Sequence, residues 1–115
     1  MLLMSTSISG EANRSLSMII HVVAFRWKPG IPQEHVATVQ SQLLEFVSDL
    51  PEVKSYRCGP DLGVSDMQNF DFAIVAEFDT VDDWRVYDKH PRHEEIRAGV
   101  VRPWIETRAS VQYEV

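Results

Sequence analysis

The sequence predicts a single α+β domain in which four strands form one antiparallel sheet and helical segments connect them. Two segments rich in β-branched and aromatic residues, an amphipathic stretch with helical spacing between them, and a clean apolar and polar alternation at the end of the chain carry this prediction. The chain has 115 residues, of which 44% are hydrophobic and 24% are charged. This length and composition fit one hydrophobic core and exclude a largely disordered chain.

Charge and cysteine content exclude several classes of function. Seventeen acidic residues against eleven basic ones give a net charge of -6, and no basic cluster is present, so we expect no nucleic-acid partner. No apolar run approaches the roughly 18 residues of a membrane span, so we expect no membrane association. Cys58 is the single cysteine, which excludes an internal disulfide. Reduced cysteine fits a cytoplasmic location, which we take as the expectation.

The first segment, 1–17, is expected to lie outside the folded domain. It mixes Ser, Asn, Gly and Thr with few apolar side chains, and burial of so little apolar surface would not offset the loss of chain entropy. We therefore predict a disordered N-terminal extension over 1–17 and a folded domain over 18–115.

The first strand is predicted from Met18 to Lys28, because this segment is β-branched and aromatic until Pro29 and Gly30 end it. One face of this strand carries Ile20, Val22 and Ala24, and the other carries His21, Val23, Phe25 and Trp27. Both faces are apolar, which is typical of a strand that is covered on both sides.

A helix over about 32–50 is predicted next, because apolar residues recur at three- and four-residue steps after Pro32. Pro51 ends it, and a short strand is predicted over 53–58. After a polar loop, the alternation over 70–78 predicts a second long strand that is also apolar on both faces.

Two short helices that meet at a proline are predicted next. Thr80 and Asp83 have the spacing of a helix start, and this helix runs to about Lys89. His90 precedes Pro91 and is therefore disfavoured in the α region, while Pro91 can open the next helix. The last segment, 108–115, alternates as a strand and is expected to point Ala109, Val111, Tyr113 and Val115 inward.

The resulting order, β-α-β-β-α-β, is that of a ferredoxin-like domain with a four-stranded antiparallel sheet. Right-handed crossovers place both helical connections on one face of the sheet and leave the other face bare. Because the two long strands are apolar on that face as well, and monomers rarely expose such a patch, we predict a two-fold homodimer.

The segments IIHVVAFRWKPG, LPEVKSYRCGPDL, FDFAIVAEFDTVDDWRVYDKHPRHEEI and VQYEV resemble the stress-responsive dimeric α/β barrel (Dabb) family over residues 18–115. The most specific part is the pattern YxxHPxH, formed here by Tyr87, His90, Pro91 and His93. The resemblance implies a dimer in which two four-stranded sheets form a barrel. It implies less about chemistry, because many members have no assigned reaction.

Three polar residues are expected to converge on a pocket between the sheet and the helices, namely His21, Tyr87 and His93. A histidine near the start of a helix is expected to favour its neutral form and to accept a proton, and a tyrosine beside it can donate a hydrogen bond. The apolar residues expected to contact a ligand there are Val23, Phe25, Phe72, Trp84, Ile96 and Trp104.

The Dabb family includes plant polyketide cyclases of the olivetolic acid type, which promote an intramolecular aldol condensation without a cofactor. The resemblance implies that their essential tyrosine and histidine correspond to Tyr87 and His93, and a further pocket histidine to His21. The cyclases carry another histidine on the third strand, where this chain has Phe72. This departure counts against a shared substrate.

Three functions stay open at this point. The first is binding of a small apolar carbonyl or phenolic compound in stress response or secondary metabolism. The second is a cofactor-free enzyme, a cyclase or a monooxygenase, with Tyr87 and His93 as the acid and base. The third is a structural interaction module without a ligand. A metal site formed by His21, His90 and His93 is disfavoured because HPxH bends at the proline, so we expect neither metal nor cofactor.

Overall fold

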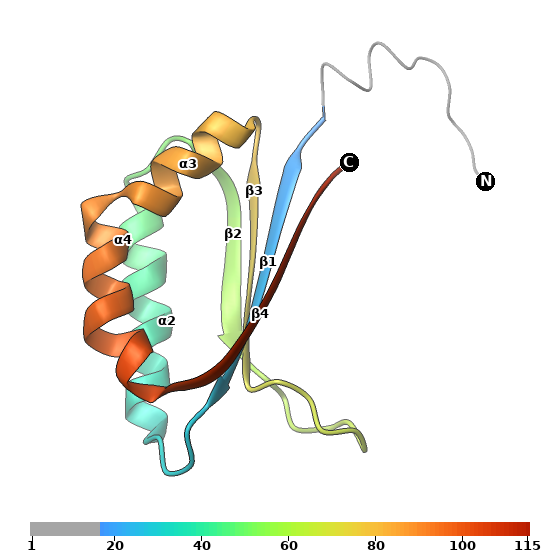
Figure 1. Ribbon diagram of the computed structural model, residues 1–115, viewed down its shortest axis with the longest axis vertical. Coiled ribbons are helices and arrows are strands. Elements are labelled where there is room, and N and C mark those ends of the chain that lie inside the picture. Colours follow the sequence, from blue (N-terminus) through green and yellow to red (C-terminus); the bar gives the residue numbers. More distant parts are fainter. Residues whose placement is uncertain (1–16) are drawn as a thin grey trace, which may run out of the picture.

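The computed structural model describes residues 17–115, which form one sheet covered on one face by helices (Figure 1). The extension predicted over 1–17 lies outside the described residues except for Ser17, so its state stays a prediction.

The sheet has the strand order β2-β3-β1-β4, and every neighbouring pair is antiparallel. The predicted ferredoxin-like topology is therefore confirmed. The strands are β1 (Ile19–Trp27), β2 (Val53–Pro60), β3 (Phe72–Phe78) and β4 (Ile105–Glu114). The second strand continues through Gly59 and Pro60, which were expected to end it, because Pro60 lies on an edge strand, where a missing N–H costs no ladder bond.

The helices are α2 (Gln33–Ser48), α3 (Val81–Lys89) and α4 (Pro91–Ile96), and all three lie on the same side of the sheet (Figure 1). Pro32 is the N-cap of α2 rather than part of its first turn, and the buried face of this helix is formed by Val39, Leu43 and Phe46. A π-helical turn (Arg97–Val101) and a 3-10 turn (Arg102–Trp104) follow α4. The single helix predicted after Pro91 is therefore divided into three short pieces.

The junction of α3 and α4 follows the local chemistry of the sequence. The hydroxyl of Thr80 accepts a hydrogen bond from the Asp83 amide at 3.0 Å, which caps the start of α3. His90 is extended, with φ -61° and ψ 134°, as a residue before proline tends to be. Its Nδ1 atom accepts a hydrogen bond from the Arg92 amide at 3.0 Å. His90 thus ends one helix and caps the next.

The core lies between the sheet and the helices. The face of β1 that carries His21, Val23, Phe25 and Trp27 is buried against the helices, as the predicted pocket requires. The same layer is completed from β3 by Phe72, Ile74, Ala76 and Phe78.

The other face of the sheet carries no helix. Val22 of β1 lies opposite Val75 of β3 and Val111 of β4, and residues paired across antiparallel strands share one face. The expectation that Val111 and Tyr113 point inward is therefore wrong, together with that for Ala109 and Val115. Alternation separates the two faces of a strand but does not tell which face the helices cover. Val111, Tyr113 and Val115 are exposed in the single chain, at 57%, 51% and 64%.

Candidate functional site

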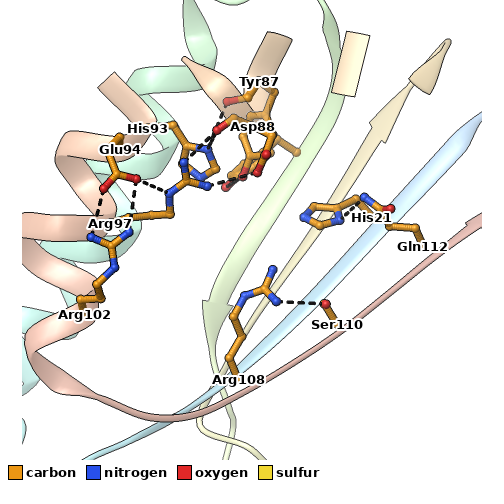
Figure 2. A network of polar contacts seen from close by, with 11 residues as sticks. His21, Tyr87, Asp88, His93, Glu94, Arg97, Arg102, Arg108, Ser110 and Gln112 are labelled. Carbon is orange, nitrogen blue, oxygen red and sulfur yellow. Dashed lines mark hydrogen bonds and ion pairs between the residues drawn. The ribbon is translucent and has the colours of Figure 1, made fainter. Parts of the chain in front are cut away.

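A cavity of about 330 Å³ lies between the sheet and the segment that follows α3. Five predicted residues line it, namely His21, Val23, Phe25, Tyr87 and His93. The other residues of its lining were not predicted from the sequence as site residues, and they are Leu43, Ile74, Asp88, Arg97, Val101, Arg102, Ile105 and Arg108. The cavity therefore combines apolar side chains with charged ones. Figure 2 shows the charged and polar residues.

The structure places four other predicted ligand contacts outside this lining. Phe72 is 1% exposed and stacks on Phe25, with ring centroids 6.1 Å apart. Ile96 is buried in the core. The ring centroid of Trp84 lies 6.0 Å from that of His21. The ring centroid of Trp104 lies 6.0 Å from that of His35. These four side chains pack in or against the core, and periodicity alone does not tell which of them reaches the cavity.

The orientation of His93 is set by the main chain. Its Nδ1 atom lies 3.1 Å from the Tyr87 carbonyl oxygen and 3.3 Å from that of Asp88. Both carbonyls belong to the last turn of α3, where helix carbonyls lack partners within the helix. Since a carbonyl only accepts, Nδ1 is the protonated nitrogen. In the neutral ring the Nε2 atom is then an acceptor.

The environment of His93 keeps the ring neutral. Burial lowers its pKa to about 4, and the nearby positive charge of Arg97 acts in the same direction. His93 is 7% exposed and its ring lies 4.4 Å from that of Tyr87. Near neutral pH the cavity wall therefore presents an imidazole that accepts hydrogen bonds or a proton.

His21 presents the opposite character. Its Nδ1 atom lies 3.0 Å from the amide nitrogen of Gln112. An amide nitrogen only donates, so Nδ1 accepts and Nε2 carries the hydrogen in the neutral ring. Burial lowers the pKa of His21, and the charge of Arg108 lowers it further. The two cavity histidines therefore offer one donor and one acceptor.

The hydroxyl of Tyr87 is paired with another tyrosine. It lies 3.0 Å from the hydroxyl of Tyr56, which β2 contributes. Tyr87 is 2% exposed, and burial raises its pKa to about 12, so it keeps its proton. Tyr56 was not predicted as a site residue, because its only signal in the sequence is its place in a short strand.

An ion-pair network forms the helical rim of the cavity (Figure 2). Arg97 contacts Asp88 at 3.1 Å and Glu94 at 3.1 Å. Arg102 contacts the other oxygen of Glu94 at 3.0 Å. None of these pairs was predicted. Only Glu94 and Arg97 leave a signal in the sequence, because they have the spacing of neighbours on a helix. The others depend on how the chain turns after Ile96.

Within residues 17–115, no three His, Cys, Asp or Glu side chains are grouped so that they could hold a metal ion. The same part of the chain contains no helix that combines the length and the apolar character needed to cross a membrane.

The comparison with known proteins identifies the domain. The family model of the stress responsive A/B barrel domain matches residues 19–115. Among solved structures, a dimeric ferredoxin-like protein of unknown function from Thermobifida fusca is 34% identical, with a TM-score of 0.78 over 86% of this chain and 92% of that one. No curated protein matches the chain.

Two more distant structures share the fold. A hydroxynitrile lyase from Passiflora edulis is 23% identical, with a TM-score of 0.72 over 85% of this chain and 93% of that one. A Dabb family protein from Mesorhizobium loti is 20% identical, with a TM-score of 0.70 over 84% of this chain and 95% of that one. At these identities the likeness shows the fold alone. From the match over residues 19–115, the chain belongs to the stress-responsive A/B barrel (Dabb) family.

Proposed function

We propose that this protein binds a small apolar carbonyl or phenolic compound in the cavity between its sheet and its helices. The observation that carries the proposal is the pairing of one imidazole acceptor, on His93, with one imidazole donor, on His21, at the wall of an apolar cavity of about 330 Å³. A carbonyl accepts from the donor and a phenol donates to the acceptor, while Val23, Leu43 and Ile74 offer apolar contact. An open cavity argues against a purely structural module.

We further propose that the protein is a homodimer. The helix-free face carries an apolar row in which Val22 lies between Val75 and Val111. Val75 is 38% exposed in the single chain and Val111 is 57% exposed. The Thermobifida fusca relative, 34% identical, is described as dimeric. Two copies packed sheet to sheet would remove this row from water.

A second candidate function, cofactor-free acid and base chemistry, is favoured by the geometry of His93. Its Nδ1 atom is held by two carbonyls, which leaves Nε2 as a base toward the cavity it lines. If Tyr56 donates to Tyr87, the proton of Tyr87 is available to a carbonyl oxygen of the ligand. In this candidate His93 removes a proton next to the carbonyl and Tyr87 supports the oxygen.

Binding is tested with a panel of neutral ketones and phenols, from acetophenone to 4-hydroxyacetophenone, followed by protein NMR. We expect shifts confined to the cavity lining. The variant H93A should weaken binding of the phenols at least tenfold, because it removes a hydrogen bond to a buried acceptor. The control H90N changes a histidine outside the cavity and keeps an acceptor for the Arg92 amide. Shifts elsewhere, or equal binding by H93A and the parent, would reject this site.

The same variants separate binding from catalysis. In heavy water, a base in the cavity exchanges the methyl hydrogens of bound acetophenone for deuterium. We expect H93A to slow this exchange about 100-fold, the lower range for a positioned general base. Exchange no faster than in buffer, together with binding, would leave the first function and remove the second.

A further inference from the structure

The charges around the cavity do not balance. Its lining contains three arginines, Arg97, Arg102 and Arg108, against one carboxylate, Asp88. A second carboxylate, Glu94, lies beside the lining and pairs with two of these arginines. Arg97 is paired with both carboxylates, and Arg102 shares Glu94 with it. Within the described part of the chain, Arg108 forms no ion pair, and its guanidinium donates only to the hydroxyl of Ser110 at 3.1 Å. One cation therefore faces the cavity without a counter-charge.

The sheet directs Arg108 to this place. Arg108 lies opposite Phe25 in the pairing of β4 with β1, as Gln112 lies opposite His21. Paired residues share a face, so Arg108 is on the helix-facing side of the sheet. Figure 2 shows its side chain extending from β4 toward the side of the cavity that His93 and Arg97 occupy. Its charge also lowers the pKa of His21, as expected for a neighbour in the same cavity.

Arg108 is suited to anion recognition. A guanidinium has five N–H donors in a planar fork that matches a carboxylate, and Ser110 occupies one of them. The lining also offers apolar side chains, among them Val23, Phe25 and Ile105. A ligand that fits both parts has an apolar body and one anionic end.

We infer that the cavity takes small monocarboxylates and that Arg108 binds their carboxylate at the β4 side, while the apolar body lies toward β1. This inference rests on the proposed binding function and narrows its ligand class to carbonyl or phenolic compounds that carry an acid group. Arg108 is then the residue that selects acids over neutral compounds of the same shape.

The test uses two probes of nearly equal shape, 4-hydroxybenzoate and 4-hydroxybenzamide, which differ in charge near neutral pH. Dissociation constants are measured by NMR titration for the parent, R108Q and R85Q. R85Q removes the same charge from the exposed surface of α3, where Arg85 pairs with Asp82 outside the cavity. Because Arg108 is exposed on its strand, R108Q is expected to keep the fold, which circular dichroism checks.

We expect the parent and R85Q to bind the benzoate about tenfold tighter than the amide, from a charge-assisted hydrogen bond in a partly hydrated site. R108Q should lose this preference while its affinity for the amide stays unchanged. Added salt should weaken binding of the benzoate but not binding of the amide, because the site is open to solvent and its charge is screened.

Each other outcome overturns the inference and reports separately on the proposed function. Equal binding of both probes by the parent, or a preference for the benzoate that persists in R108Q, removes the acid subsite but leaves the cavity as a binding site. Binding of neither probe also removes the acid subsite, and the neutral ketones and phenols then decide the proposed function on their own.

Discussion

The character of each cavity histidine follows from the atoms beside its Nδ1. His93 donates through Nδ1 because its neighbours are carbonyl oxygens, and His21 accepts through Nδ1 because its neighbour is an amide nitrogen. Two chemically identical side chains thereby become an acceptor and a donor toward the cavity. From the sequence we expected both histidines at the pocket, and a neutral His93 because it lies near the start of a helix. In the structure the pKa of His93 is lowered by burial and by the charge of Arg97.

Stability should depend on pH through His93. Its pKa is near 6.5 when unfolded and about 4 when folded, so between these values the unfolded chain binds a proton that the folded protein does not. The free energy of unfolding therefore falls as the pH falls from 6.5 toward 4, by about 2 kcal/mol between pH 7 and pH 5 for this group. Urea unfolding at the two pH values measures the loss.

An NMR titration of the imidazole assigns the effect. The His93 signals should stay those of the neutral ring, with the hydrogen on Nδ1, from pH 8 down to pH 5. Protonation of this ring near pH 6.5 in the folded protein would contradict the predicted origin of the pH dependence.

At the scale of elements, the turn between the last two helices positions the base. α3 ends at Lys89, His90 is extended, and Pro91 starts α4. The chain therefore turns back, and the imidazole of His93 lies against the final turn of α3. The local signals that produce this path are a proline and the residue before it. Both residues belong to the YxxHPxH pattern, on which the sequence-based expectation of a site rests.

The start of α3 offers a test of this element. The Thr80 hydroxyl accepts from the Asp83 amide, so T80A should lower the free energy of unfolding by about 1 kcal/mol, while T80S should retain the hydrogen bond and most of the stability. Urea unfolding of both variants measures the difference. A loss in T80S as large as that in T80A would mean that the hydroxyl does not cap the helix.

The sequence predicted the elements better than the contacts between them. Hydrophobic spacing was sufficient for the order of strands and helices along the chain, and a helix start was visible at Thr80. Tyr56 and Arg108 were not identified, because their importance comes from neighbours far along the chain, Tyr87 and Phe25. The prediction of which face of β4 points toward the helices was wrong for the same reason, since strand register is a tertiary property.

At the scale of the whole molecule, one face of the sheet has no cover within the described chain. Our proposal of a dimer predicts that V111E is monomeric, because a carboxylate would be enclosed between two sheets at a cost of several kcal/mol. In the single chain Val111 is 57% exposed, so the substitution should not unfold the protomer. Sedimentation at micromolar concentration measures the state of assembly.

A matched variant supplies the control. V86E places the same charge on α3, where Val86 is 43% exposed, and should leave the dimer intact. A parent protein that sediments as a monomer, or a V111E variant that stays dimeric, would contradict the proposed sheet-to-sheet contact.

The peptide oxygens that hold His93 have a consequence for how this scaffold can diverge. Every amino acid at positions 87 and 88 supplies the same carbonyls, so substitutions there can reshape the binding chamber without rotating the imidazole. Ligand preference can therefore change among descendants of this protein while the Nε2 atom of His93 keeps its orientation. A change that straightens the kink at His90 and Pro91 would turn it away.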